Sequence, residues 1–310
     1  MESGTCMNEK IYDMLIVGGG PGGYTAALYA ARAGLSVLVL EKLAAGGQMA
    51  ETPQIDNYPG YLGVDGFMLG QQMKEGAEKF GAVSRFAEVT ALHLEGKTKS
   101  VDTTDGVFYG KTVVVATGAH PRKLNVPGEA ELFGRGVHYC AACDGMFYRG
   151  KTVAVVGGGN TAAAAALVLS RVASKVLLIH RRDTLRASGV YHKPLQELTN
   201  VEFHWNSTVS EIRQGEVAVE NVISGEKQML PCDGVFVSVG RQPESGLVKG
   251  LLHLDEQGYI LADETTRTNI PGVFAVGDVR TKGLRQIITA AADGATAVHY
   301  AESYIAEAGF

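Results

Sequence analysis

Cysteine is scarce in this chain of 310 residues, which has four of them. That number cannot supply the dense disulfide framework of small secreted domains. The sequence has no run of about 18 apolar residues, so it predicts no transmembrane helix. The first ten residues lack the basic stretch followed by an apolar one that marks a secretory signal. We therefore expect a cytoplasmic protein that does not enter a membrane.

Concentrated positive charge is also missing. The formal net charge is −5 and no polybasic block occurs, so neither nucleic acid nor an anionic membrane surface is expected as a partner. Hydrophobic residues make up 45% and charged residues 20% of the chain, an ordinary globular mixture. The length favours two domains, each able to bury its own core.

Glycine, in contrast, is abundant, with 40 residues gathered at the ends of short apolar runs. Residues 12–41 have the pattern strand, glycine turn, alanine-rich helix and strand, and the second strand ends at Glu41. Gly18, Gly20 and Gly23 stand in the G-x-G-x-x-G register of a dinucleotide-binding turn. The glycines admit a pyrophosphate to the helix N-terminus, and Glu41 can accept hydrogen bonds from a ribose.

Residues 152–183 repeat this unit, with a turn from Gly157 to Ala162. Its second strand ends in His180, Arg181 and Arg182 in place of a carboxylate, and Arg186 follows. A carboxylate repels a 2′-phosphate, whereas a basic cluster binds it. The first unit therefore favours a nucleotide with a free 2′-hydroxyl, such as FAD, and the second favours NADPH over NADH.

Two of the cysteines, Cys140 and Cys143, form a C-x-x-C just before the second unit. By itself this spacing indicates either a redox pair or half of a zinc site. His138 is close, but a structural zinc site usually needs four ligands, and no second C-x-x-C is present. We expect Cys6 to be an uninvolved thiol in a polar tail and Cys232 to pack in a core.

Two dinucleotide units in one chain indicate electron transfer between two cofactors. A nicotinamide delivers hydride, a flavin accepts two electrons, and a dithiol–disulfide pair can take both. Asp144 directly follows Cys143, where a carboxylic acid can protonate a departing thiolate or a flavin-derived anion. A helix cap or turn is the alternative role for Asp144.

A series of segments, in this order along residues 10–307, resembles low-molecular-weight, bacterial-type thioredoxin reductase. The segments are 18–23 (GGGPGG), 46–48 (GGQ), 116–118 (ATG), 140–145 (CAACDG), 157–162 (GGGNTA), 180–186 (HRRDTLR), 277–278 (GD) and 284–286 (LRQ).

The resemblance implies an α/β fold with two Rossmann-like three-layer domains, in which the NADPH domain is inserted into the FAD domain. Residues 1–120 and 248–310 are then the discontinuous FAD domain, and residues 121–247 are the NADPH domain that carries the C-x-x-C. Segments 120–123 and 242–249 become candidate hinges between the two domains.

The resemblance also extends both cofactor sites. The FAD site then includes Gly18, Gly20, Pro21, Gly23, Glu41, Gly46, Gln48, Asn57, Thr117, Gly118, Gly277, Asp278, Arg285 and Gln286. The NADPH site then includes Gly157, Gly159, Asn160, Thr161, His180, Arg181, Arg182 and Arg186. No metal site is expected.

The implied activity is thioredoxin-disulfide reduction by a homodimer. NADPH reduces FAD, FAD reduces the Cys140–Cys143 disulfide, and the dithiol reduces thioredoxin by thiol–disulfide exchange. Cys143 lies nearer the flavin in this family, and which sulfur attacks thioredoxin stays open. Asp144 completes the catalytic set.

One departure from the family stands out, because Ala164 and Ala165 occupy positions where paired glutamates are common. Alanine suits a helix, so we expect the fold to survive this change.

Four other interpretations of the function stay open: a flavoprotein acting on another protein disulfide, a ferredoxin–NADP-type reductase, an oxidase acting on a dithiol, and a nucleotide-sensing or zinc-binding module. The cysteine pair disfavours the ferredoxin–NADP-type reductase, and the basic cluster disfavours the oxidase.

Overall fold

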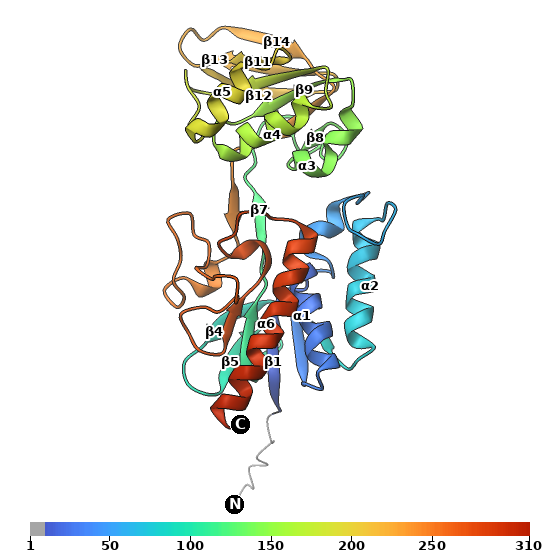
Figure 1. The fold of residues 1–310 in the computed structure, drawn as a ribbon, viewed down its shortest axis with the longest axis vertical. Helices are drawn as coiled ribbons and strands as arrows, with labels where there is room; N and C mark the ends of the chain where they lie inside the picture. Colours follow the sequence, from blue (N-terminus) through green and yellow to red (C-terminus); the bar gives the residue numbers. More distant parts are fainter. Residues whose placement is uncertain (1–9) are drawn as a thin grey trace, which may run out of the picture. The chain divides into compact units, whose positions relative to one another are not determined.

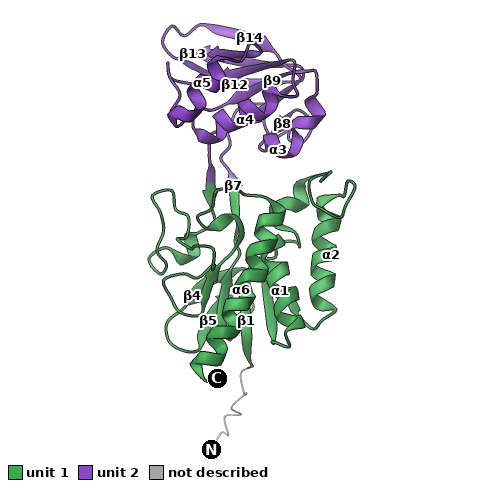
Figure 2. Cartoon of the chain, viewed as in Figure 1, with its two compact units in different colours: residues 1–120, 242–310 green, residues 121–241 purple. Residues whose placement is uncertain are grey.

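A computed structural model describes residues 10–310, so Cys6 lies outside the described residues. The chain divides into two compact units, drawn in different colours in Figure 2: unit 1 is residues 1–120 with 242–310, and unit 2 is residues 121–241. The return to unit 1 therefore falls at Gln242, whereas the sequence placed it at residue 248. Strand β16 (Arg241–Pro243) carries the chain back by pairing with β7 (Ala119–Pro121).

Unit 1 is built on a seven-stranded sheet in the order β3-β2-β1-β6-β5-β4, with β17 also pairing with β6. Strands β1, β2, β3, β6 and β17 run parallel to one another, and β5 runs antiparallel to both of its neighbours, β4 and β6. The strands are β1 Ile11–Val17, β2 Val37–Glu41, β3 Val83–Phe86, β4 Val89–His93, β5 Lys99–Thr103, β6 Gly106–Val115 and β17 Val273–Ala275.

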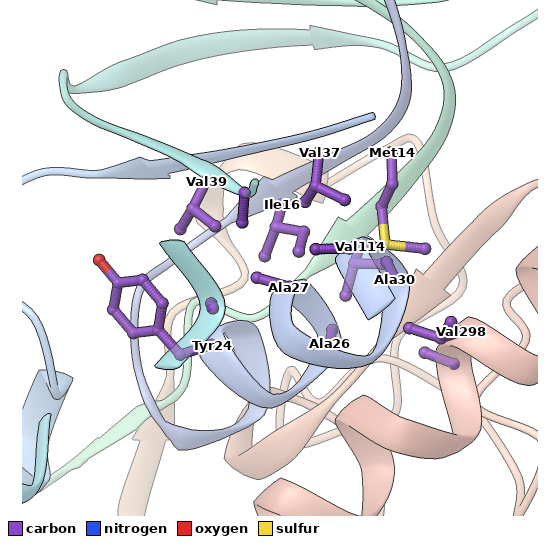
Figure 3. Close-up of a cluster of buried hydrophobic side chains, with 14 of the residues drawn as sticks. Met14, Ile16, Tyr24, Ala26, Ala27, Ala30, Val37, Val39, Val114 and Val298 are labelled. Atoms are coloured by element: carbon purple, nitrogen blue, oxygen red, sulfur yellow. The ribbon is translucent and has the colours of Figure 1, made fainter. Parts of the chain in front are cut away.

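Three helices cover one face of this sheet (Figure 1). Their small side chains allow close packing: Ala27 of α1 lies against Ile16 of β1 (Figure 3), and a Cβ at Gly294 of α6 would collide with the Gly22 carbonyl of α1. Apolar residues from 92–101 and 248–279 cover the opposite face. The helices are α1 Pro21–Arg32, α2 Gly66–Glu78 and α6 Ile287–Ala308, with 3-10 turns η1 Gly47–Glu51, η4 Gly246–Val248 and η5 Gly277–Val279.

Unit 2 contains a five-stranded parallel sheet in the order β11-β10-β9-β15-β8. One core of this unit packs α4 on the sheet, and a second core joins the sheet to an antiparallel sheet, β12-β13-β14. The strands are β8 Val137–His138, β9 Thr152–Val156, β10 Lys175–Ile179, β11 Val201–His204, β12 Ser207–Arg213, β13 Glu216–Asn221, β14 Lys227–Pro231 and β15 Gly234–Val237. The helices are α3 Ala141–Asp144, α4 Asn160–Ser170 and α5 His192–Gln196, with η2 Gly145–Tyr148 and η3 Gly189–Tyr191.

Both strand–turn–helix–strand units predicted from the glycine pattern are present, as β1-α1-β2 and β9-α4-β10. The alanine run that replaces the glutamates continues α4 without a break, and Ala165 is buried in its core. The predicted fold class, an α/β protein of two Rossmann-like parts, is confirmed.

Candidate active site

The carboxyl ends of four parallel strands meet at one edge of the unit 1 sheet. Val17 is in register with Leu40 and Val115, and Val115 is in register with Ala275. The segments that leave these strands carry Gly18, Glu41, Thr117–Gly118 and Gly277, in that order across β1, β2, β6 and β17. Ligands of open α/β sheets bind at such an edge, so the register brings these sequence-predicted residues to one site.

The glycine turn after β1 leaves no room for a side chain at Gly18 or Gly23. Gly18 has φ +109°, and a Cβ there would collide with the Ala116 carbonyl, while a Cβ at Gly23 would collide with the Gly18 carbonyl. Gly20 caps α1, with Pro21 in its first turn and no side chain capping the helix. Nothing lies within 4 Å of where a Cβ at Gly20 would point. The turn therefore forms a cradle at the uncapped N-terminus of α1, which suits a pyrophosphate.

Glu41 is held at the end of β2 by two backbone N–H groups. Gly19 donates to its Oε2 at 2.6 Å and Leu43 donates to its Oε1 at 2.9 Å. The carboxylate is thereby fixed beside the glycine turn, with acceptor capacity left for a ribose, since an ionised carboxylate has about four lone-pair sites.

Two predicted flavin ligands that lie 229 positions apart in the sequence contact each other: the Asn57 amide donates to Oε1 of Gln286 at 3.0 Å. Gln286 also caps α6 in a capping box with Thr289. Near the first glycine turn, Gly46 (φ +105°) donates its N–H to the Gly19 carbonyl at 2.8 Å. Exposed Gln48 follows in η1.

The remaining predicted residues of unit 1 cluster around β6 and β17. The Thr117 hydroxyl donates to the Glu244 carbonyl at 2.6 Å, and Gly118 (φ +76°) accepts from the Glu244 N–H. Arg285 stacks over the Tyr259 ring at 4.0 Å and donates to the carbonyl of Asp278. Its guanidinium is thus fixed at the turn that contains Gly277 and Asp278.

A buried ionic cluster that the sequence reasoning missed supports this turn. Asp293 of α6 accepts from the Gly277 N–H at 2.8 Å, from Arg280 and from Lys282. Burial alone would raise the pKa of the Asp293 carboxyl, but the hydrogen bonds from Arg280 and Lys282 hold it below its usual value. The one available signal was an acid inside the alanine-rich stretch 287–301 of α6.

Unit 2 repeats the glycine cradle after β9. Gly157 has φ +145°, and a Cβ there would collide with the Ser238 carbonyl. Gly159 caps α4 without a side-chain hydrogen bond. Asn160 accepts the N–H of Ser188 at 2.7 Å, which ties the start of α4 to the loop after β10, and Thr161 beside it is exposed.

The basic cluster at the end of β10 divides into an exposed part and a buried part. Arg181, Arg182 and Arg186 are exposed, and Arg186 donates its N–H to the Gly158 carbonyl at 2.7 Å. His180 is 4% exposed, and its ring fills the space that a Cβ at Gly158 would need. The structure therefore places the three arginines together at the surface and His180 beneath them.

Burial, together with the charges of Arg186, Arg182 and Arg181, lowers the pKa of His180. The ring is consequently neutral near pH 7. Its Nε2 has no hydrogen-bond partner.

Cys140 and Cys143 form a disulfide at the start of α3, with their Cα atoms 5.2 Å apart. Cys140 is the N-cap of this short helix, and its sulfur accepts from the Cys143 N–H at 3.2 Å. Exposed Met146 and Phe147 follow in η2. Bonded sulfurs are not thiolates, which are the metal-binding form. Residues 10–310 contain no group of three or more His, Cys, Asp or Glu side chains that could hold a metal ion.

Oδ2 of Asp144 lies 3.1 Å from Nδ1 of His138. The sequence suggested His138 only as a metal ligand, because a pair six positions apart across a strand and a turn has no sequence signature.

Cys232 is buried in the core of unit 2, and burial raises the pKa of its thiol to about 12. Within the described chain, no helix is both long and apolar enough to cross a membrane.

Comparison with known proteins adds three findings. The model of the pyridine nucleotide-disulphide oxidoreductase family matches residues 12–294. The chain is similar to a thioredoxin reductase of Listeria innocua, with 44% identity over 96% of this chain and 95% of that one, and to one of Bacillus subtilis, with 42% identity over 96% of each. The crystal structure of thioredoxin reductase from Streptococcus pyogenes matches with a TM-score of 0.91 and 45% identity, over 96% of this chain and 99% of that one.

Proposed function

Because the chain belongs to the pyridine nucleotide-disulphide oxidoreductase family and, within it, to the thioredoxin reductases, we propose that it uses FAD and NADPH to reduce the disulfide of a thioredoxin. The observation that carries the proposal is the Cys140–Cys143 disulfide, which lies in the same unit as the second glycine cradle. A thioredoxin reductase needs nucleotide sites and a reducible disulfide, and the glycine cradles and the Cys140–Cys143 pair are the candidates for these roles.

The cradle of unit 1 fits FAD. Its turn tolerates no Cβ at Gly18 or Gly23 and presents the bare N-terminus of α1, which suits a pyrophosphate. Glu41 would bind the adenosine ribose, because its carboxylate is already aimed by the Gly19 N–H. Asp278, Arg285 and Gln286 would hold the other end of the molecule, near the turn after β17.

The cradle of unit 2 fits NADPH. Gly157 and Gly159 leave the N-terminus of α4 open to a pyrophosphate, and the exposed guanidinium groups of Arg181, Arg182 and Arg186 suit the 2′-phosphate. His180 would act indirectly, by packing beneath the turn. When both cofactors are bound, they would supply the two electrons that reduce the disulfide.

The thiol chemistry belongs to residues of unit 2. One sulfur of the reduced pair attacks the substrate disulfide as a thiolate, a mixed disulfide forms, and one substrate sulfur leaves. The second sulfur then attacks the mixed disulfide, restores the Cys140–Cys143 bond and releases the second substrate sulfur. The two protons given up by the enzyme thiols match the two gained by the substrate sulfurs.

The surroundings of the disulfide support this chemistry. In the reduced protein, the Cys143 N–H that donates to the Cys140 sulfur would favour the thiolate of Cys140, because a hydrogen bond to an anion stabilises it. Asp144 would give or take a proton at the pair. Met146 and Phe147, which are 57% and 47% exposed, offer an apolar surface next to it on which a protein substrate can dock.

Anaerobic titration with NADPH followed by oxidised thioredoxin tests the whole electron path. We expect NADPH to bleach the flavin absorbance and thioredoxin to restore it. Cys140→Ser and Cys143→Ser should still allow bleaching but should consume one equivalent of NADPH fewer per flavin and should not reduce thioredoxin. Cys232→Ser is the matched control, since that buried thiol forms no disulfide, and it should behave as the wild type. Wild-type turnover by either catalytic variant would overturn the assignment of the dithiol.

We propose further that the enzyme is a cytoplasmic homodimer, as the resemblance to its family implies. Sedimentation equilibrium tests the assembly. A monomer at the concentration at which the enzyme is active would contradict it.

A further inference from the structure

Three side chains of unit 2 form a chain of polar contacts that ends at Asp144, the residue after Cys143. Nδ1 of His138 lies 3.1 Å from Oδ2 of Asp144, and Nε2 of the same ring lies 2.8 Å from the hydroxyl of Tyr148. His138 and Tyr148 are 6% and 7% exposed, and the Asp144 side chain is 18% exposed. Both ring nitrogens of a buried histidine are therefore engaged, one of them by the residue that follows Cys143.

The imidazole is held in one orientation. His138 is in register with Phe236 in the pairing of β8 with β15, and the two rings stack with centroids 5.3 Å apart and an interplanar angle of 26°. The Tyr148 ring packs edge-on against both. Tyr148 has its place because Gly234 bears no side chain: a Cβ there would collide with the phenol. A rigid sheet thus aims His138 at Asp144.

The hydrogen-bonding capacities of the three groups match. An ionised carboxylate can only accept, and the buried Tyr148 hydroxyl is free to donate because burial raises its pKa. An imidazole that accepts from Tyr148 at Nε2 carries its proton on Nδ1, the nitrogen that lies 3.1 Å from Oδ2 of Asp144. This tautomer follows from the partners, and it turns the ring N–H toward the carboxyl group of Asp144.

We propose that His138 is a positioning residue for thiol–disulfide exchange, which holds the Asp144 carboxyl in place beside Cys143. The inference rests on the proposed function, in which two protons leave the enzyme thiols as the Cys140–Cys143 bond forms and two are gained by the substrate sulfurs. Asp144 carries protons at the cysteine pair. His138 itself touches neither sulfur in this scheme and acts through Asp144.

A purely structural histidine would give a different result from a positioning one. Losing a core contact lowers stability, and its effect on turnover adds to that of any change at Asp144. A residue that acts through Asp144 loses its effect once the carboxyl group is gone, because the effects of mutations at residues in contact do not simply add.

The test is a double-mutant cycle read as kcat and as KM for thioredoxin. Asp144→Asn should lower kcat by roughly 100-fold, the lower end of general acid–base effects. His138→Phe keeps the stacked ring but removes both nitrogens, and it should lower kcat about 10-fold and leave KM unchanged, a loss small enough for an indirect role. The double variant should match Asp144→Asn alone. His138→Asn, whose amide can still donate to Asp144, should recover most of the loss.

A matched control comes from the exposed pair of His93 and Asp102 in unit 1, which has the same 3.1 Å separation. His93→Phe should leave kcat unchanged. Additive losses in the cycle, or no recovery with His138→Asn, would overturn the positioning role. Failure of the wild type to reduce any thioredoxin would overturn the proposed function instead, and bleaching of the flavin by NADPH in each variant shows that the steps before the disulfide are intact.

Discussion

Arg280 and Asp293 form a bidentate ion pair inside unit 1, with Nε–Oδ2 and Nη2–Oδ1 distances of 2.9 and 2.6 Å. Both side chains are almost fully buried. Lys282 adds a bond of 2.7 Å and the Gly277 N–H another of 2.8 Å, so one carboxylate receives four donors. The cluster ties α6 to the turn that follows β17, where the proposed flavin site contains Gly277 and Asp278.

Asp293→Asn should destabilise the protein strongly. The substitution leaves the cations of Arg280 and Lys282 buried without a counter-charge, a change that typically costs about 3–5 kcal/mol. Urea unfolding followed by circular dichroism measures the loss. Asp105→Asn, at an exposed loop position, is the control and should change stability by no more than roughly 0.5 kcal/mol. Equal stability of the two variants would show that the cluster is neutral.

The same cluster predicts that the folded protein loses stability at acid pH. Because the pKa of Asp293 is lower in the folded protein than in the unfolded chain, the unfolded state takes up the proton first as the pH falls. The stabilisation is complete above the ordinary carboxyl pKa and is lost as the pH drops through the lower, folded value. Asp293→Asn should therefore flatten the fall in melting temperature below about pH 4, the ordinary range of an aspartate.

Local sequence patterns were sufficient for the two nucleotide units. Gly23 is required by a close contact with the Gly18 carbonyl in its own turn, and Gly18 and Gly157 have positive φ. Such local constraints appear directly as glycine spacing. The change from Glu41 to a basic cluster at the second strand end was equally readable, because it occupies one fixed position in each repeat.

Contacts between distant segments could not be read in this way. The pairing of Asn57 with Gln286 depends on how a loop after η1 meets the start of α6. The burial of His180 depends on the missing side chain of Gly158, which leaves room for its ring. The return to unit 1 at residue 242 follows from the pairing of β16 with β7. Each of these strands has three residues, too few for a recognisable strand pattern in the sequence.

The contact between Asn57 and Gln286 predicts a graded effect on flavin binding. Asn57→Ala removes a hydrogen bond of 3.0 Å that orients the Gln286 amide, and losing one such bond costs roughly 0.5–1.5 kcal/mol. We expect the Kd of the apoprotein for FAD to rise about 2- to 10-fold, which corresponds to that range. Quenching of flavin fluorescence on reconstitution measures it. Gln54→Ala, in the same loop but paired with Asp56, should leave the Kd unchanged.

The three exposed arginines predict the choice of nicotinamide cofactor. Arg181→Ala combined with Arg182→Ala removes two charge-assisted phosphate contacts, each worth roughly 1.5–3 kcal/mol. The KM for NADPH should rise and the preference for NADPH over NADH should narrow, with little change in the KM for NADH. Steady-state kinetics with both donors checks this. Arg213→Ala, which removes an exposed guanidinium paired with Glu211, should alter neither, and an unchanged NADPH/NADH ratio in the double variant would place the phosphate pocket elsewhere.

His180 gives a spectroscopic prediction that is independent of turnover. Burial and the charges of Arg186, Arg182 and Arg181 lower its pKa, so NMR titration of the labelled ring should give a value below the ordinary 6.5 or so of histidine. The folded protein then binds this proton less readily than the unfolded chain, and its stability should decrease as the pH falls below that ordinary value.

A 2′-phosphate ligand should raise the pKa of His180 by offsetting the guanidinium charges. 2′,5′-ADP is the probe and 5′-AMP, which lacks the 2′-phosphate, is the control. Equal shifts with the two ligands would mean that the phosphate does not bind above His180, whereas a larger shift with 2′,5′-ADP that disappears in the Arg181→Ala, Arg182→Ala variant would tie the buried ring to the charge of the cofactor.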